Sequence, residues 1–284
     1  MNTIKLGFKA FDPHELLCHF VASKAGLYLR ENLNVELIDI TFMDDLALPK
    51  DLFQASCGAA LSSALKGSTQ RILFVATDMP MFWIYSRKEI TSLADLTNSS
   101  LATFPVIAPP HHLANIILQK SGVNSAQQMT LLPARDDVAR FGLLKSGSVD
   151  AAVISSSIAP PVIEESGFNN LCFFGNEIRI PTTGLAVDES FLQKEPELVH
   201  LIIKIHKESL ALIHNDVELL EGVLSEYFNV ADQHVKVCAA LYQHFYTENG
   251  RTTETIAQNA IDSLCKSLSL SSVPIWNQLY TFPE

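Results

Sequence analysis

Apolar and polar residues alternate with two different periods over the first forty positions of the chain. Residues 3–10 alternate as a strand does, and residues 34–42 alternate again. Between them, the stretch 14–32 places apolar side chains such as Leu16 and Phe20 at the spacing of an amphipathic helix. This order of strand, helix and strand predicts the βαβ unit from which parallel sheets are built.

Both ends of this predicted helix carry residues that are common at helix ends. Asp12 is a candidate N-cap, and Pro13 suits the first helical position because that position needs no backbone donor. Gly26 is expected to close the helix in a left-handed conformation.

The same alternation of elements continues after the second strand. Residues 53–57 predict a short strand, residues 59–66 a helix of small side chains, and residues 71–79 a buried strand that runs on into 81–90. This extended stretch is longer than a common strand of about five or six residues. We therefore expect it to cross from one lobe to another, with a second α/β lobe over residues 90–177.

The last third of the chain differs from the rest. Residues 178–187 are extended again, and residues 195–284 are largely helical, with apolar positions on one face of each helix. The predicted fold class is α/β, a protein of two Rossmann-like lobes joined by two extended crossovers, with the helical C-terminal part packed on lobe 1. Lobe 1 is expected to comprise residues 1–83 and 184–284, and lobe 2 residues 84–183.

Composition excludes several classes of function. The chain of 284 residues carries a formal charge of −11, and its basic residues are scattered, which argues against nucleic acid as a partner. No apolar run approaches the roughly 20 residues that span a bilayer, so we expect no membrane insertion. Five cysteines without a CxxC spacing argue against a disulfide framework or a zinc site. We expect no metal and no cofactor.

A resemblance to a known family begins in the stretch "VASKAGLYLRENLNVELI". It resembles the start of the NMT1/THI5-like group, which has the type II periplasmic-binding-protein fold. Asn32 stands where that family often has Gly. The residues that match the family pattern are Lys24, Tyr28, Glu31, Leu33, Val35 and Glu36.

Later segments extend the resemblance over almost the whole chain. "ALSSALKGSTQRILFVATDMPMFWIYSRKEITSLADLTNSSLAT" is similar to the family's helix, strand, crossover and third-strand sequence, in the same order. "LLKSGSVDAAVIS" and "TTETIAQNAIDSLCKSLSL" are similar to later family segments. The resemblance implies a solute-binding protein of an ABC importer, because most members are such receptors. Some similar folds are enzymes of thiamine-pyrimidine or menaquinone biosynthesis, so a cytosolic enzyme is the alternative.

Candidate ligand-binding residues follow from where ligands sit in two-lobed α/β proteins. Ligands bind at strand carboxyl ends and helix amino ends, where backbone donors are available. The candidates are Phe11, Asp12, His14, Ser56, Cys57, Asp78, Trp83, His111, Ser155, Ser156 and Thr182.

Several of these residues also have an ordinary structural interpretation. Asp12 caps a helix whether or not it contacts a ligand, and Cys57 fits a packed small residue better than a nucleophile. His111 and His112 point about 100° apart on a helix, so we expect one of them to face the ligand. Trp83 and its neighbour in the strand point to opposite faces, so one of the two belongs to the core.

The nature of the ligand is narrowed by departures from the family pattern. Members that bind sulfonate or inorganic anions commonly have a Gly/Ser-rich turn where this chain has "FPVIAPPHH", and proline offers no donor. Asp12 and Asp78 add negative charge at two strand ends. We therefore expect a small organic ligand, first a nitrogen heterocycle such as a pyrimidine precursor, then an aromatic or sulfonate-type acid, and no catalytic residue.

The sequence leaves the location and the partners open between two alternatives. No signal-peptide pattern stands at the start, which predicts a cytoplasmic protein as the chain stands and a periplasmic or membrane-anchored one if a signal segment was removed. A receptor would have an ABC permease as its partner, besides its small-molecule ligand. We expect a monomer.

Overall fold

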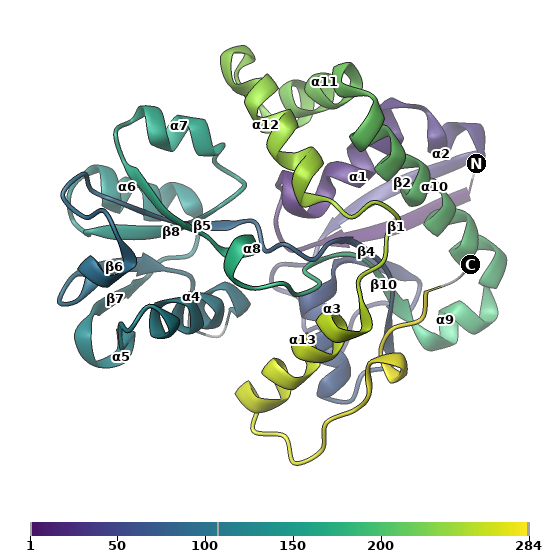
Figure 1. Cartoon of the computed structure of the whole chain (residues 1–284). Coiled ribbons are helices and arrows are strands. Elements are labelled where there is room, and N and C mark those ends of the chain that lie inside the picture. Colours follow the sequence, from purple (N-terminus) through teal and green to yellow (C-terminus); the bar gives the residue numbers. More distant parts are fainter. Residues whose placement is uncertain (1, 107, 283–284) are drawn as a thin grey trace. The chain divides into compact units, whose positions relative to one another are not determined.

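The computed structural model describes residues 2–106 and 108–282, which form two compact units (Figure 1). Unit 1 comprises residues 2–78 and 180–282 of the described chain, and unit 2 comprises Met79–Arg179. The chain thus passes between the units after residues 78 and 179, where the sequence analysis placed the boundaries after residues 83 and 183. The observed division keeps strand β5 (Phe82–Ser86) whole in unit 2, where it pairs along its full length.

Unit 1 contains a five-stranded mixed sheet in the order β2-β1-β3-β10-β4. Strand β1 is parallel to β2 and β3, whereas β10 is antiparallel to β3 and β4. The carboxyl ends of β1, β3 and β4 therefore meet the amino end of β10 at one edge, which we call the carboxyl edge of unit 1. The strands are β1 (Asn2–Phe8), β2 (Leu33–Asp39), β3 (Leu52–Ser56), β4 (Gln70–Thr77) and β10 (Thr183–Asp188).

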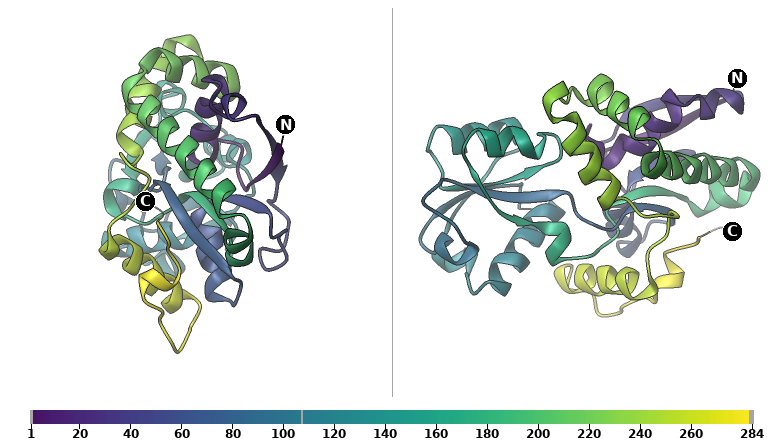
Figure 2. Two further views of the ribbon diagram at one scale, coloured as in Figure 1. Left: turned by 90° about the vertical axis from the view of Figure 1, so that its right-hand side faces the viewer. Right: turned by 45° about the horizontal axis from the view of Figure 1, so that its top comes forward.

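Helices from both ends of the chain pack together in unit 1. Helix α1 (Pro13–Lys24) packs against α10 (Pro196–Asn215) and α11 (Val217–Phe228), and α11 packs against α12 (Asp232–Phe245) (Figures 1 and 2). The short helix α2 (Leu27–Arg30) follows α1. The helical C-terminal part therefore packs on the first lobe, as the sequence predicts.

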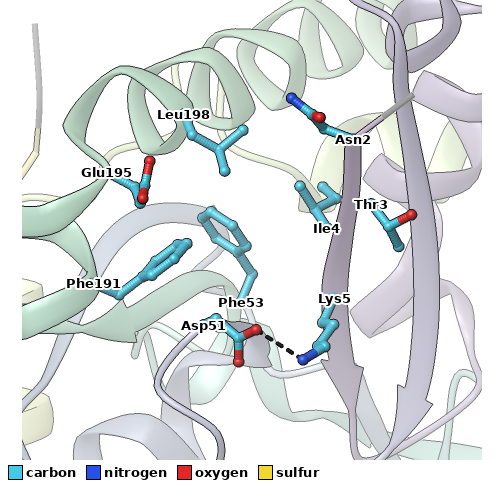
Figure 3. A pocket seen from close by; sticks show the side chains of 9 residues that line it. All are labelled: Asn2, Thr3, Ile4, Lys5, Asp51, Phe53, Phe191, Glu195 and Leu198. Atoms are coloured by element: carbon cyan, nitrogen blue, oxygen red, sulfur yellow. Dashed lines mark hydrogen bonds and ion pairs between the residues drawn. The ribbon is translucent and has the colours of Figure 1, made fainter.

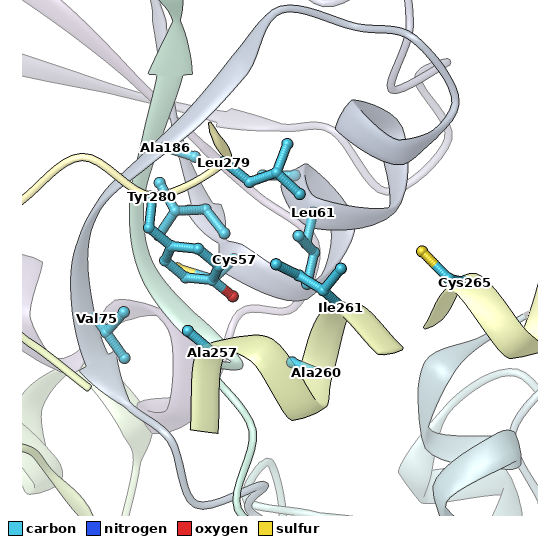
Figure 4. Packing of buried hydrophobic residues seen from close by; sticks show 12 residues of the cluster. Cys57, Leu61, Val75, Ala186, Ala257, Ala260, Ile261, Cys265, Leu279 and Tyr280 are labelled. Atoms are coloured by element: carbon cyan, nitrogen blue, oxygen red, sulfur yellow. The ribbon is translucent and has the colours of Figure 1, made fainter. Parts of the chain in front are cut away.

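A second group of helices packs around a separate apolar cluster of the same unit. Helix α3 (Cys57–Leu65) meets α13 (Glu254–Ser267) through Leu61, Ala257 and Ile261, all buried (Figure 4). These side chains remove apolar surface from water, which is the main driving force for holding α13 in place. Helix α9 (Glu189–Lys194) and a short 3-10 helix, η2 (Trp276–Gln278), complete the unit.

The outer strand of this sheet, β4, is covered by two C-terminal segments. The Val75 amide donates to Gly250 O at 2.8 Å, and the Thr247 amide donates to Ala76 O at 2.8 Å. Further along β4, Ile72 forms a parallel bridge with Tyr280. Gly250 has φ +74°, and a Cβ there would lie 2.2 Å from the Phe74 ring, so glycine is required. An edge strand that would otherwise offer free backbone groups is thereby blocked.

The local sequence explains the ends of α1 as expected. Asp12 has extended backbone angles and its side chain accepts from the Glu15 amide, while Pro13 occupies the first turn. Gly26 has φ +70°, the left-handed conformation expected for it. The cap, the proline and the glycine are therefore confirmed.

Unit 2 repeats this strand arrangement, with the order β7-β6-β8-β5-β9. Strand β6 is parallel to β7 and β8, and β5 is antiparallel to β8 and β9. In each unit the antiparallel strand is the first one after the chain enters from the other unit. The remaining strands are β6 (Ser100–Thr103), β7 (Thr130–Pro133), β8 (Ala151–Ser155) and β9 (Asn169–Phe173).

The helices of unit 2 connect these strands. They are η1 (Leu93–Leu96), α4 (Pro109–Lys120), α5 (Ser125–Gln128), α6 (Asp137–Lys145), α7 (Pro160–Glu165) and α8 (Phe174–Glu177). The carboxyl ends of β6, β7, β8 and β9 lie at the same edge as the amino end of β5, and we call this the carboxyl edge of unit 2. Within the two described stretches of chain, no helix combines the length and the apolar character needed to cross a membrane.

Candidate functional site

The carboxyl edge of unit 1 brings together residues that are far apart in the sequence. His14 Nε2 lies 2.8 Å from Thr182 Oγ1, although 168 positions separate the two residues. The Thr182 hydroxyl donates to Thr77 O at 3.2 Å, and the Gly58 amide donates to Thr182 O at 3.2 Å. Ser56 lies opposite Thr183 in the pairing of β3 with β10. The edge thus collects His14, Ser56 and Thr182 of the expected set.

His14 is held in its neutral form at this edge. The side chain is buried, and desolvation lowers the pKa of His14 to about 3 because burial disfavours the charged imidazolium. Near neutral pH the ring therefore offers one N–H donor and one acceptor nitrogen. A neutral ring bonded to a threonine hydroxyl suits a polar, uncharged ligand group better than a full negative charge.

A carboxyl that the sequence analysis did not single out lies beside it. Glu15 accepts from the backbone amides of Lys9 at 2.7 Å and Ala10 at 3.2 Å, and so holds the loop that follows β1. Burial, together with the nearby charge of Asp12, raises the pKa of Glu15 to about 8, and the two backbone amides oppose that shift. Asp12 itself is buried and caps α1, with the Glu15 amide 3.1 Å from its Oδ1.

An aromatic ring is exposed on the same loop. Phe11, in the loop that joins β1 to α1, has 52% of its surface exposed. Its ring centroid is 5.8 Å from that of Phe8, 5.5 Å from Phe20 and 6.1 Å from Phe228. Two edge-on contacts and one tilted contact therefore hold a ring that is half exposed.

Two other candidate residues of unit 1 have structural roles. Cys57 is fully buried, and its Sγ lies 3.5 Å from Phe74 O. Asp78 is also buried, and its carboxylate accepts from the Thr252 hydroxyl at 2.7 Å while its carbonyl accepts from the Ile180 amide at 2.9 Å. Asp78 thus ties the two segments at which the chain leaves and re-enters unit 1.

Behind α1, a buried polar chain links three helices. His19 Nδ1 lies 3.3 Å from the Tyr28 hydroxyl, which lies 2.9 Å from His206 Nε2. Burial lowers the pKa of His19 to about 4 and that of His206 to about 3. Both imidazoles are therefore neutral at physiological pH, and Tyr28, one of the residues that match the family pattern, joins them.

The carboxyl edge of unit 2 is organised around a buried ion pair that sequence reasoning missed. The Asp137 carboxylate pairs with Arg140 Nη2. It also accepts from the Ser155 amide at 2.9 Å, from the Ser155 hydroxyl at 2.6 Å and from the Ser157 hydroxyl at 2.6 Å. Ser156, between these serines, is buried. The serine loop after β8 is therefore held by Asp137.

Arg140 is fully buried and makes further contacts with three segments, one in β8, one after β7 and one after β6. Its Nε donates to Val153 O at 2.7 Å, its Nη1 donates to Ala134 O at 2.8 Å, and its guanidinium lies 3.5 Å from the centroid of the Phe104 ring. Burial lowers the pKa of Arg140, and Asp137 opposes that shift. The Asp and Arg stand three positions apart in "DDVARF", a spacing that places them on one helix face and was the available clue.

The aromatic and histidine candidates of unit 2 divide into buried and exposed members. Trp83 is 3% exposed and stacks on Phe173 at 4.9 Å between centroids, whereas its neighbour Phe82 is only partly buried. His111 is buried, with Nδ1 3.4 Å from the Thr103 hydroxyl, and burial lowers its pKa. His112 is exposed on the same helix.

A surface hollow of unit 1 lies at the opposite edge of the sheet, beside the amino ends of β1 and β3. It measures about 400 Å³ and is lined by Ile4, Phe53, Phe191 and Leu198, with the Lys5–Asp51 ion pair at its rim (Figure 3). Within residues 2–106 and 108–282, no three His, Cys, Asp or Glu side chains gather closely enough to hold a metal ion.

The comparisons with solved structures concern the fold. The ligand-binding component of an ABC-type import system from Staphylococcus aureus, with zinc bound, has a TM-score of 0.79 and 13% identity, over 99% of this chain and 97% of its own. The alkanesulfonate-binding protein SsuA from Xanthomonas axonopodis pv. citri, bound to MOPS, has a TM-score of 0.77 and 12% identity, over 100% and 99%. The desulfurization enzyme DSZB has a TM-score of 0.70 and 14% identity, over 99% and 97%.

These neighbours share the periplasmic binding protein fold, which confirms the predicted fold class. One of them is an enzyme, so the fold alone does not decide between binding and catalysis. None of the curated proteins matches the sequence. A model of the family described as NMT1/THI5 like matches residues 60–218, more than half of the chain and all of unit 2. The chain therefore belongs to the NMT1/THI5-like family.

Proposed function

We propose that the protein binds a small planar organic solute, a nitrogen heterocycle or an aromatic acid, and delivers it to an ABC importer. The single observation that carries the ligand class is Phe11, an aromatic ring that is half exposed yet held by three other rings at a strand carboxyl end. Such a ring offers its open side to another flat molecule at little cost in side-chain entropy.

The polar groups beside Phe11 favour a ligand that is not a small inorganic anion. Asp12 lies in the adjoining helix cap, and His14 is neutral rather than cationic. Nitrate or sulfate would bring a second negative charge close to the Asp12 carboxylate. A heterocycle or an aromatic acid can instead stack on the ring and bond to the neutral imidazole and threonine groups.

An enzyme built on the same fold is the rival function, and thiol chemistry gives it no support. All five cysteines are buried in the structure. Burial raises the pKa of each thiol, most strongly at Cys18 and Cys57. A nucleophilic cysteine needs an accessible thiolate at working pH. The rival would therefore have to rely on other groups.

The test is a thermal-shift and calorimetry screen of the whole chain against 4-aminopyrimidine, cytosine, benzoate, benzenesulfonate, methanesulfonate and nitrate. A ligand that binds only the folded protein stabilises it by about 2.7 kcal/mol at a concentration of one hundred times Kd. We expect a saturable rise in Tm with at least one ring compound and none with nitrate. A melting curve that no ring compound moves would refute the proposal.

A pair of variants assigns the binding to the proposed ring. Phe11→Ala should weaken the best ligand of the screen at least tenfold, whereas Leu29→Ala, which shortens another exposed apolar side chain of unit 1, should leave it unchanged. Product formation from a bound ring compound, detected by chromatography, would instead favour the enzyme. Cell fractionation separates the two further, because a receptor must lie outside the cytoplasm.

A further inference from the structure

The pair Asn249–Gly250 lies in the segment that covers the outer side of strand β4. It is the one Asn-Gly pair in the sequence. Asn249 is exposed, whereas Gly250 is buried with φ +74° and lies against the Phe74 ring, so no larger residue fits there. An asparagine followed by glycine is chemically labile, because a residue without a side chain leaves the approach to the asparagine carboxamide open. The fold therefore requires the glycine half of a labile pair at an exposed turn.

The reaction takes place between neighbouring groups of this pair. The Gly250 nitrogen attacks Asn249 Cγ, a C–N bond forms, the Cγ–Nδ2 bond breaks, and the amide proton leaves with Nδ2 as ammonia. Water then opens the resulting five-membered succinimide at one of its two carbonyl carbons. One opening gives an ordinary aspartate. The other gives a β-linked isoaspartate, in which the main chain runs through the former side chain.

Two hydrogen bonds hold the reacting groups in the folded protein. The Gly250 amide donates to Thr247 Oγ1 at 3.2 Å, and the Thr247 hydroxyl donates to Val75 O of β4 at 2.7 Å. Asn249 Oδ1 accepts from the Arg251 amide at 3.1 Å. A peptide nitrogen becomes a nucleophile only after it loses its proton, because its lone pair is delocalised into the carbonyl. The bond from Gly250 to Thr247 therefore has to open before the attack.

The two products differ in their effect on the cover of β4. The segment is bonded to β4 on both sides of Asn249. The Thr247 amide donates to Ala76 O at 2.8 Å, and Gly250 O accepts at 2.8 Å from the Val75 amide. An isoaspartate adds one carbon, about 1.5 Å of main chain, between these two bonds. An ordinary aspartate leaves the length of the main chain unchanged, so only the isoaspartate disturbs both bonds.

We infer that Asn249 is a site of spontaneous deamidation, that its hydrogen-bonded neighbour Thr247 sets the rate, and that the isoaspartyl product detaches residues 247–250 from β4. The inference goes beyond the proposed function and needs no ligand. Its consequence is that β4 becomes an edge strand with free backbone groups as the protein ages.

The experiment incubates the whole chain at mildly alkaline pH, folded and in concentrated urea. Mass spectrometry of the tryptic peptide 237–251 follows the conversion, and isoaspartate methyltransferase labelling identifies the β-linked product. Wild-type protein should react at Asn249 at least tenfold more slowly when folded than in urea, and should still convert measurably. Thr247→Val should bring the folded rate to within about threefold of the rate in urea. Thr247→Ser keeps the hydroxyl and should keep the wild-type rate.

Hydrogen exchange of the Val75 amide measures the attachment of the segment to β4. After ageing and chromatographic separation, the isoaspartyl fraction should exchange faster at Val75 and the aspartyl fraction should not. Asn249→Asp is the matched control for the ordinary product and should keep both Tm and the slow exchange. Asn249→Gln should show no conversion at this position.

Each part of the inference has an outcome that overturns it. Folded protein that shows no conversion at Asn249 while the urea sample reacts to completion would refute the site. Equal folded and urea rates, an unchanged rate in Thr247→Val, or fast Val75 exchange in that variant before ageing would remove the role of the Thr247 hydrogen bond. Slow Val75 exchange in the isoaspartyl fraction would show that the cover of β4 tolerates the longer main chain.

Discussion

The two carboxyl edges are built from different kinds of polar group. In unit 2, Asp137 and Arg140 form a buried ion pair whose remaining bonds go to Ser155, Ser157 and strand carbonyls. In unit 1, the corresponding edge has two groups that burial keeps uncharged beside the Asp12 carboxylate: a neutral His14 and a Glu15 that holds its proton near neutral pH.

This difference separates a structural role from a recognition role. The charged groups at the edge of unit 2 pair with one another, and Asp137 also accepts hydrogen bonds from the serine loop. These contacts hold that loop in one conformation. In unit 1, the buried Gln54 side chain has no hydrogen-bond partner among the described residues. We therefore expect unit 2 to be the more sensitive to loss of a charge and unit 1 the more sensitive to pH.

The largest expected effect follows from removing the cation of the unit 2 pair. Arg140→Met leaves the Asp137 carboxylate buried without its partner, which typically costs about 3–5 kcal/mol. Urea unfolding measures this loss of stability. Trp83 serves as the fluorescent reporter of unit 2 in a Trp276→Phe background. Lys145→Met, at an exposed position of the same helix, is the control and should change stability by less than about 0.5 kcal/mol. Equal stability of the two variants would contradict the structural role assigned to the ion pair of unit 2.

The next effect is acid sensitivity of unit 1. Burial lowers the folded-state pKa of His14 and His206 to about 3 and of His19 to about 4, whereas an unfolded chain has about 6.5. The unfolded state then binds more protons below pH 6.5, so stability falls as pH drops from 6.5 towards 4. At pH 5 each histidine contributes about 2 kcal/mol of that loss.

Two reporters check which unit loses stability first. Unfolding followed by Trp276, in a Trp83→Phe background, should move to milder conditions between pH 7 and pH 5 more than unfolding followed by Trp83. His206→Gln should flatten the slope for unit 1 and leave that for unit 2 unchanged. A common slope for both reporters would contradict the assignment.

Glu15 should have a smaller effect on the pH dependence of stability, with the opposite sign. Its folded-state pKa of about 8 lies above the ordinary value of 4.5, so the folded state binds the extra proton and stability falls as pH rises from 4.5 through 8. The expected slope is about 1 kcal/mol for each pH unit. Glu15→Gln cannot ionise and still accepts from Lys9 and Ala10, so it should remove this slope in denaturation measured from pH 6 to pH 9. A slope that survives the substitution would place its origin in another group.

The smallest expected effect on stability concerns Phe11. Because half of its surface is already exposed, Phe11→Ala should change the free energy of unfolding by less than about 1 kcal/mol. Phe20→Ala, which removes a buried ring stacked 4.4 Å from Tyr227, should cost about 3–5 kcal/mol. Similar losses in both would mean that Phe11 is a core residue, and its proposed contact with a ligand would lose its basis.

Much of the fold could be predicted from the sequence because its signals are local. Asp12, Pro13 and Gly26 mark the ends of α1 within fifteen positions, and all three act as expected. The presence of two α/β lobes followed from the order of periodic segments, since alternating strands and helices build α/β sheets. The resemblance around Tyr28 added the family.

The candidate site was only partly accessible to the same reasoning. The sequence pattern shows where the strands end, so His14, Ser56 and Thr182 could be predicted as candidates without knowledge of their contacts. Arg140 was not among the candidates, because an aspartate and an arginine three positions apart on a helix give no local sign of burial. Its burial depends on carbonyls of Val153 and Ala134, which other strands supply.

The sequence by itself determined the elements, their order and the family, because capping, periodicity and composition act between neighbours in the chain. Only the tertiary structure decided which polar groups are paired. Asp137 meets Ser155 across 18 positions and His14 meets Thr182 across 168, and Gln54 in "LFQAS" is left without a partner between strands. The charge and hydrogen bonding of a buried group depend on what surrounds it in space, which no local pattern records.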